Sequence, residues 1–315
     1  MIEMVDFTNY PLSSRNLQYA GRAGEKRGIV YKNDFWFLKF PKNTIGMDKT
    51  KTLSYVTSPL SEYIGSHIYE ILGYDVHETI LGICFDGKRN KVVCACRDFI
   101  KDDRDQLLIP YTALRNDTSE AIMERNDSSL ASASNLNEII FQLEHNAVLS
   151  NIPNAKERFW DSVVVDILIN NNDRNEDNWG VIKFKSSGKY EMSPVYDNGN
   201  SFYSKTDETR IESILGDREK LISSATNGIT AYEDDDESQI SIVKMLKNEN
   251  KDFIEAMRRV YSKVIARLDD IKSFIKGIPN EFSGAFVVSE NRKSYYIETL
   301  KIRLEMLEKA LGANQ

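Results

Sequence analysis

Residues 171–180 read Asn-Asn-Asp-Arg-Asn-Glu-Asp-Asn-Trp-Gly, and residues 196–199 read Tyr-Asp-Asn-Gly. Phosphoryl transfer needs one carboxylate that orients and deprotonates an attacking hydroxyl, and an amide and a second carboxylate that hold magnesium. Protein kinases place the first two groups on one loop as Asp-x4-Asn, and the second Asp on a later loop. Asp173, Asn178 and Asp197 follow this order, separated by a predicted strand-turn-strand segment at 181–192. The stretch predicts Asp173 as the base, and Asn178 and Asp197 as Mg²⁺ ligands.

Asn, Asp and Gly are also ordinary turn residues, so the stretch alone leaves a plain loop as the alternative. A second motif favours chemistry. Lys39 lies inside the apolar segment 35–41, Phe-Trp-Phe-Leu-Lys-Phe-Pro. A buried ammonium without a partner is costly. We expect Lys39 to hold nucleotide phosphates with Glu62 of the next helix as its partner, the alternative being an edge-strand lysine with its head in water.

A glycine-containing segment precedes the first predicted strand, where a loop that covers phosphates would belong. Residues 19–26 read Tyr-Ala-Gly-Arg-Ala-Gly-Glu-Lys. Gly21 and Gly24 would let backbone N–H groups approach a phosphate, and Arg22 and Lys26 would add positive charge. Two glycines also occur in many ordinary turns, so this segment indicates a phosphate-covering loop only in combination with the other motifs.

Hydrophobic periodicity predicts an α+β protein. The expected elements are strands at 27–31, 35–40, 79–85 and 91–99, and helices at 59–72, 136–149, 159–169, 253–271 and 297–311. This order predicts a bilobal, protein-kinase-like fold: a small β-rich N-lobe over residues 1–99 with one helix, and a larger, mainly helical C-lobe over residues 100–315. Asp98 lies at the link, where we expect contact with the nucleotide base. Segment 198–232 has no clear period, and an activation segment there stays open.

Composition narrows the classes of partner. The chain has 315 residues, of which 41% are hydrophobic and 28% charged, as is usual for a globular protein. Its net charge of -7 argues against nucleic acid as a direct partner. The three cysteines form no CxxC pair, and no stretch is long and apolar enough to span a membrane. We expect a cytoplasmic protein without a membrane partner, and export by a dedicated system would leave no signal that the sequence shows.

The motifs taken together resemble a known family. Asn-x-Asp at 171–173, Asn178 and the segment 194–197, Pro-Val-Tyr-Asp, resemble the HipA-like serine/threonine kinases. Segments 19–26, 38–41, 61–63 and 178–180 are more similar still to the compact, CtkA-like branch of that family. The resemblance covers about residues 15–200. It implies a bilobal kinase fold, ATP and Mg²⁺ as cofactors, a protein substrate with a Ser or Thr acceptor, and frequent autophosphorylation.

Two departures from the family limit what carries over. The glycine segment begins near residue 19, so we expect this chain to lack the domain that precedes the nucleotide-binding lobe in toxin-type members. The expected absence of this domain weakens the case for an antitoxin partner of the HipB type, which stays open with little support from the sequence. The family motif often has His and Lys where this chain has Asn175 and Asp177. Lys26, Arg22 or Arg174 would then have to steady the γ-phosphate.

Two rival functions remain from the sequence. A small-molecule kinase of the aminoglycoside-phosphotransferase type shares the fold and the Asp-x4-Asn loop. It usually has a His directly before the catalytic Asp, where this chain has Asn172. A catalytically inactive nucleotide-binding module is the second rival, and the presence of all the base and metal-ligand residues argues against it. The sequence therefore predicts an ATP- and Mg²⁺-dependent protein serine/threonine kinase.

Overall fold

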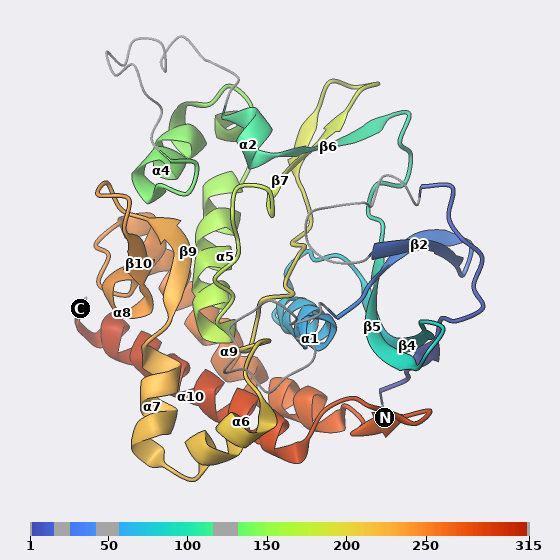
Figure 1. The fold of residues 1–315 in the computed structure, drawn as a ribbon. Helices are drawn as coiled ribbons and strands as arrows, with labels where there is room; N and C mark the ends of the chain where they lie inside the picture. The colour runs from blue at the N-terminus through green and yellow to red at the C-terminus, as the bar shows by residue number, and fades with distance from the viewer. Residues whose placement is uncertain (1, 16–25, 42–56, 116–131, 314–315) are drawn as a thin grey trace. The chain divides into compact units, whose positions relative to one another are not determined.

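The computed structural model describes residues 2–15, 26–41, 57–115 and 132–313, and these form two compact units (Figure 1). Unit 1 contains residues 1–99, 198–225 and 265–302, and unit 2 contains residues 100–197, 226–264 and 303–315. Unit 1 thus combines the first 99 residues of the chain with the later segments 198–225 and 265–302. The predicted lobe boundary at residues 99 and 100 stays a prediction.

Unit 1 is built on a five-stranded sheet of order β1-β4-β5-β3-β2. Strand β1 runs parallel to β4, and the other neighbours are antiparallel. In β3 the side chains of Trp36 and Leu38 enter the core, whereas Lys39 alternates to the other side, as the two-residue period of a strand requires. The strands are β1 Val5–Asp6, β2 Lys26–Tyr31, β3 Asp34–Lys39, β4 Thr79–Phe85 and β5 Asn90–Arg97.

Helix α1 (Ser58–Ile71) contacts β4 and β5 of this sheet (Figure 1). It begins with a proline in its first turn, which suits a position whose N–H needs no helical partner. Leu60, Ile64 and Ile68 recur at four-residue spacing and are buried. The chain turns away after the helix at Gly73, whose φ of 79° favours glycine. Because α1 is buried over most of its surface, it also carries polar side chains into the interior of unit 1.

Unit 2 contains a three-stranded sheet, a two-stranded sheet and several helices around the buried helix α5. Most residues of α5 are buried, and its C-terminal half is largely apolar, which is typical of a core helix. The elements of unit 2 are β6 Gln106–Pro110, α2 Tyr111–Leu114, α4 Leu136–His145, α5 Ala155–Ile169, β7 Gly180–Phe184, β8 Tyr190–Met192, β9 Ile229–Glu233, β10 Gln239–Ser241 and α8 Ile242–Met245.

The remaining helices lie late in the chain. Helix α6 (Glu208–Leu215) belongs to unit 1, and α7 (Arg218–Thr226) belongs to it except for its last residue. The long helices α9 (Lys251–Gly277) and α10 (Glu290–Ala313) contribute residues to both units. Of the helices in the described part of the chain, none combines the length and apolarity that a membrane span requires.

Most elements agree with the expected ones to within a few residues, and the differences concern short elements. Strand β6 and helix α2 lie in a polar stretch where the sequence predicts no element. The aperiodic segment 198–232 contains α6, α7 and β9. These elements are too short to show a clear period, and pairing with distant residues stabilises them: β6, for example, pairs with β7.

Gly180 gives the first testable prediction. A Cβ atom at Gly180 would collide with the carbonyl oxygen of Ile109 and lie 2.8 Å from Cα of Pro110. Gly180→Ala should therefore lower the free energy of unfolding by about 1–3 kcal/mol, because β6 must shift. The matched control is Gly216→Ala, where the nearest atom outside the chain neighbours lies 3.5 Å away and φ is -74°. It should be neutral or stabilising by about 0.4–1 kcal/mol. Equal effects in urea unfolding would contradict the prediction.

Candidate active site

The loop that carries Asp173 begins where α5 ends. Asn170 caps the helix in the left-handed conformation, with φ of 55°. Its backbone N–H and that of Asn171 donate to the carbonyls of Ile167 and Asp166. Asn is among the residues that tolerate this conformation at a helix C-terminus. The cap turns the chain out of the buried helix, so the loop at 171–178 starts from a fixed point.

Arg174 anchors this loop inside unit 2. Its guanidinium donates two hydrogen bonds to the carboxylate of Asp166, from Nε at 2.9 Å and from Nη2 at 3.0 Å. The two side chains are only 3% and 5% exposed. Nη1 donates to the backbone carbonyl of Tyr196. The suggestion that Arg174 steadies a γ-phosphate is therefore wrong, because its guanidinium is buried and already engaged.

The Arg174 contact also positions the second loop. Tyr196 precedes Asp197 in the chain, and its hydroxyl donates to the carbonyl of Asp177 at 2.9 Å. Two hydrogen bonds thus tie the residue before Asp197 to the loop that carries Asp173 and Asn178. Asp197 itself has a φ of 59°, in the left-handed region. The three predicted residues of unit 2 are held on two connected loops.

The donor atoms on these loops fit a magnesium ion. Asn178 donates from Nδ2 to the backbone carbonyl of Asp173 at 2.6 Å, and this bond fixes which side of the amide carries the oxygen. The amide oxygen of Asn178 and the carboxylate of Asp197 are hard ligands of the kind that Mg²⁺ prefers. Asp173 is exposed, as a base that meets an incoming hydroxyl must be, and Oδ1 accepts a hydrogen bond from Asn175 at 3.2 Å.

In unit 1 the structure brings Lys39 and Glu62 together. Nζ of Lys39 lies 2.7 Å from Oε2 of Glu62, and the side chains are 14% and 0% exposed. Burial by itself would raise the pKa of Glu62, but the charge of Lys39 and the contact with His77 outweigh it and lower the pKa far below its usual range. The pair is therefore ionised at neutral pH, as phosphate binding by Lys39 requires. The catalytic roles of both residues stay predictions.

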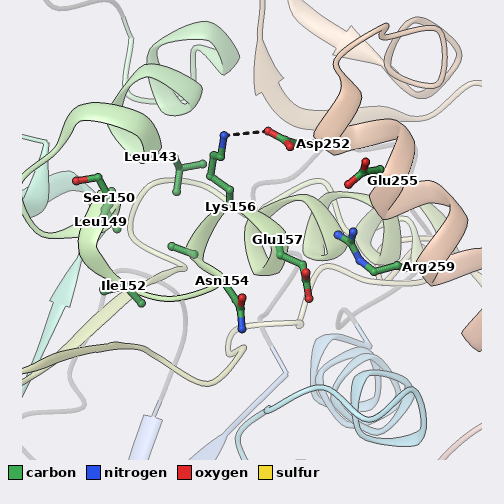
Figure 2. Close-up of a pocket in the computed structure, with 11 residues that line it drawn as sticks. Leu143, Leu149, Ser150, Ile152, Asn154, Lys156, Glu157, Asp252, Glu255 and Arg259 are labelled. Atoms are coloured by element: carbon green, nitrogen blue, oxygen red, sulfur yellow. Dashed lines mark ion pairs between the residues drawn. The ribbon is translucent and has the colours of Figure 1, made fainter.

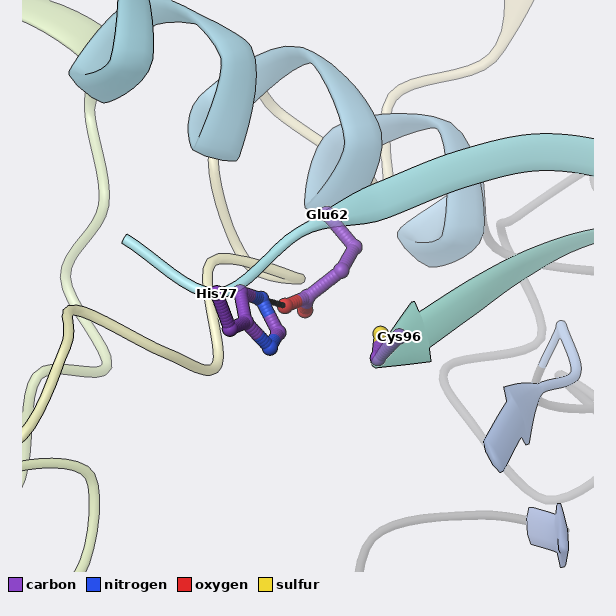
Figure 3. A group of neighbouring side chains, drawn as sticks. All are labelled: Glu62, His77 and Cys96. Carbon is purple, nitrogen blue, oxygen red and sulfur yellow. Dashed lines mark ion pairs between the residues drawn. The ribbon is translucent and has the colours of Figure 1, made fainter. Parts of the chain in front are cut away.

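His77 is a partner of Glu62 that the sequence analysis did not single out. Its Nε2 lies 2.9 Å from Oε1 of Glu62, and Cys96 lies close by at the end of β5 (Figure 3). The three side chains offer possible metal donors within 4.8 Å of one another. Because Lys39 and His77 already contact the two oxygens of the Glu62 carboxylate, we assign this cluster to the ion pair. A lone histidine in a sequence gives no signal of such a role.

Of the other predicted nucleotide-binding residues, Lys26 and Asp98 are described by the structure. Gly21, Arg22 and Gly24 lie outside the described residues. Lys26 begins β2, with its Nζ 5.8 Å from the centre of the Phe37 ring. Asp98 donates its backbone N–H to the Phe35 carbonyl at 2.9 Å, and its carboxylate pairs with Arg15 at 2.8 Å. Contact between Asp98 and a nucleotide base stays a prediction.

A cavity of about 320 Å³ in unit 2 is lined by none of these residues. It lies at the start of α5, between Lys156 and Glu157 on one side and Asp252, Glu255 and Arg259 of α9 on the other (Figure 2). A smaller cavity of about 30 Å³ is lined by Arg174 and Asn178, among others. A choice of site by cavity size alone would therefore have missed the loops that carry Asp173, Asn178 and Asp197.

Comparison with known proteins gives the chain a family context. No family model matches the sequence. The chain is 28% identical over 320 residues to the serine/threonine-protein kinase CtkA of Helicobacter pylori strain J99, covering 98% of this chain and 92% of that protein. The crystal structure of the H. pylori proinflammatory kinase CtkA matches with a TM-score of 0.83 at 25% identity, over 99% of both chains.

A second solved structure supports the fold. HipA in the complex of HipA, HipB and operator DNA from Shewanella oneidensis MR-1 has a TM-score of 0.53 at 12% identity, covering 98% of this chain and 74% of that one. At this identity the likeness concerns the fold alone. The predicted α+β kinase fold, with a β-sheet N-lobe and a helical C-lobe, is confirmed, and so is the predicted resemblance to a CtkA-like kinase. The HipA structure shares this fold.

The burial of Arg174 leads to a stability prediction. Arg174→Ala should lower the free energy of unfolding by about 3–5 kcal/mol, because it removes the bidentate partner of a buried carboxylate. The control is Lys156→Ala, which removes ion pairs to Glu144 and Asp252 whose side chains are about 40% exposed. It should cost less than about 1 kcal/mol. Denaturant unfolding measures both values, and a loss for Arg174→Ala no larger than the control would contradict the role given to Arg174.

The lowered pKa of Glu62 leads to a prediction about acid stability. The folded pKa lies below the unfolded value of 4.5. The ionised carboxylate therefore stabilises the fold above that pH, and this contribution is lost as the pH falls below it. The unfolding free energy of wild type should fall more steeply with acid than that of Glu62→Gln. Glu78→Gln, which changes a half-exposed carboxylate paired with Arg97, should keep the wild-type slope. If the unfolding free energies of wild type and Glu62→Gln fell equally with acid, the lowered pKa of Glu62 would be refuted.

Proposed function

We propose that this protein is an ATP- and Mg²⁺-dependent serine/threonine protein kinase. The observation that carries this function is the likeness to the serine/threonine-protein kinase CtkA over 98% of this chain, with a structural match over 99%. The donor groups on the loops of unit 2 and the ionised Lys39–Glu62 pair of unit 1 are the types that this chemistry needs. A protein substrate with a Ser or Thr hydroxyl follows from the same class of activity.

The residues of unit 2 act on the hydroxyl and the metal. Asp173 accepts the proton of the acceptor hydroxyl and orients its oxygen, so its pKa needs little displacement. Asn178, through its amide oxygen, and Asp197, through its carboxylate, hold Mg²⁺. The hydrogen bonds of Arg174 and Tyr196 keep these ligands in place. When bound, ATP would supply the γ-phosphoryl group and leave as ADP, and Mg²⁺ would neutralise charge on the phosphates.

The residues of unit 1 act on the nucleotide. Lys39 binds the α- and β-phosphates, and Glu62 holds its ammonium at 2.7 Å. This pairing limits the rotamers of a long flexible side chain, so less freedom is lost when the phosphates bind. Gly21, Arg22, Gly24 and Lys26 are proposed to cover the phosphates. Autophosphorylation belongs to the proposal because the resemblance to the HipA-like kinases implies it.

Transfer of label from γ-labelled ATP tests the proposed function. Purified protein with Mg²⁺ and a generic protein acceptor should place label on Ser or Thr of the acceptor or of the enzyme. Asp173→Asn and Asp197→Asn should lose at least about 100-fold of this rate, because one removes the base and the other a charged metal ligand.

Asp177→Asn is the matched control for this experiment. Asp177 is exposed on the same loop, and its carboxylate accepts a hydrogen bond from the Thr112 hydroxyl. Its replacement should leave the rate within about threefold of wild type, since a neutral amide also accepts this bond. Label transferred only to small metabolites would instead show a small-molecule kinase. Saturable ATP binding without transfer to any acceptor would show a binding module.

A further inference from the structure

We propose that a buried hydrogen-bond chain from Glu62 through His77 and Ser66 to Asn198 positions both the Lys39–Glu62 pair and the Asp197 turn for nucleotide binding. His77, Ser66 and Asn198 are thus positioning residues, which act through Lys39 and Asp197. The inference rests on the proposed function, since it assigns to that site three residues to which the sequence analysis gives no role.

The contacts form a continuous series within unit 1. Nε2 of His77 lies 2.9 Å from Oε1 of Glu62 and 3.2 Å from Oγ of Ser66. Nδ2 of Asn198 donates to the same Ser66 hydroxyl at 3.0 Å. Ser66, Asn198 and Glu62 are no more than 1% exposed, and His77 is 3% exposed. Each link is shielded from water, so breaking one leaves a buried polar group without a replacement partner.

His77 lies against the oxygen of Glu62 that Lys39 does not contact. Its Nε2 faces this oxygen at 2.9 Å, and the same Nε2 lies within hydrogen-bond distance of Oγ of Ser66, at 3.2 Å. Nδ1 has no hydrogen-bond partner among the described residues. Oγ of Ser66 also accepts a hydrogen bond from Asn198. Ser66 therefore limits the position of the imidazole, and the imidazole limits the position of the Glu62 carboxylate.

Close packing at Gly65 fixes the distance that this chain spans. A Cβ atom at Gly65 would lie 2.8 Å from Cβ of Asn198 and 2.8 Å from Oγ of Ser201. Real Cβ atoms do not approach so closely, so α1 meets Asn198 at a position that only glycine allows. Ser66, the next residue of α1, is thereby brought within hydrogen-bond distance of Asn198.

The far end of the hydrogen-bond chain bears on Asp197 through the backbone. Asn198 follows Asp197 directly, and Asp197 has a left-handed φ of 59°. A non-glycine residue stays in that region only where its surroundings hold it there. The anchored side chain of Asn198 limits the backbone on one side of Asp197, and the Tyr196 contacts with Arg174 and Asp177 limit it on the other. The carboxylate that would hold Mg²⁺ is thus oriented before the nucleotide arrives.

Two serine variants of the same helix test the inference. Ser66→Ala removes the central hydroxyl of the hydrogen-bond chain. Ser61→Ala makes the same change at another fully buried position of α1, where the hydroxyl has no hydrogen-bond partner among the described residues. Calorimetry measures the affinity of wild type and both variants for ATP, with saturating Mg²⁺ and with EDTA. Circular dichroism and thermal unfolding confirm that each variant is folded at the temperature used.

Ser66→Ala should weaken Mg-ATP binding by about 3- to 10-fold, the size expected for one buried hydrogen bond. The loss should be smaller with EDTA, because the metal ligand Asp197 is then not engaged. Ser61→Ala should stay within about twofold of wild type under both conditions. A loss that is equal in the two variants, or equal with and without Mg²⁺, would show a general packing effect and overturn the inference.

A double-mutant cycle on Ser66 and Asn198 provides a second readout. If the two side chains act through their mutual bond, Ser66→Ala/Asn198→Ala should bind Mg-ATP no more weakly than the worse single variant, and additive losses would overturn the inference. Failure of the proposed function is separable. Wild type that binds Mg-ATP but transfers no phosphate would refute the kinase activity and leave this binding test intact. Wild type that binds no Mg-ATP would overturn both.

Discussion

The buried pair between Arg174 and Asp166 is the interaction on which the chemistry of unit 2 depends. A buried ion pair recovers its desolvation cost only when its geometry is good and its remaining donors are satisfied. Here the guanidinium meets both carboxylate oxygens of Asp166, and its third nitrogen reaches the Tyr196 carbonyl. Helix α5, the loop with Asp173 and Asn178, and the residue before Asp197 therefore share one anchor. The positions of Asp173, Asn178 and Asp197, the proposed base and metal ligands, follow from it.

A second buried ion pair organises unit 1 by the same reasoning. Glu62 is fully buried, which by itself would raise its pKa, yet its pKa is lowered because the charge of Lys39 and the contact with His77 favour the ionised carboxylate. A carboxylate in this setting can hold an ammonium in one place without becoming protonated itself. The polar chain through Ser66 to Asn198 extends this arrangement, because each member is buried and each contacts the next. Polar networks of this kind specify one arrangement only when nearly every member is satisfied.

The sequence predicted the parts of the site that follow local rules. Strand alternation placed Lys39, helix periodicity placed α1 with Glu62, and the Asp-x4-Asn spacing placed Asp173 and Asn178 on one loop. What it missed depends on contacts between distant residues. Arg174 was one of three candidates for contact with the γ-phosphate, because a loop arginine gives no sign of burial and its partner Asp166 lies on the preceding helix. Ser66 and Asn198 are 132 positions apart, so no periodicity connects them. Short elements such as β6 escaped for the same reason, since tertiary pairing defines them.

A crystal structure of the protein with Mg²⁺ and a non-hydrolysable ATP analogue would show whether Asn178 and Asp197 hold the metal. We expect a Mg²⁺ ion about 2.0–2.1 Å from the amide oxygen of Asn178 and from a carboxylate oxygen of Asp197. Lys39 should be bonded to the α- or β-phosphate while its pair with Glu62 persists. Nucleotide bound in the cavity at the start of α5, or metal held by Glu62, His77 and Cys96 with Lys39 displaced, would refute these roles.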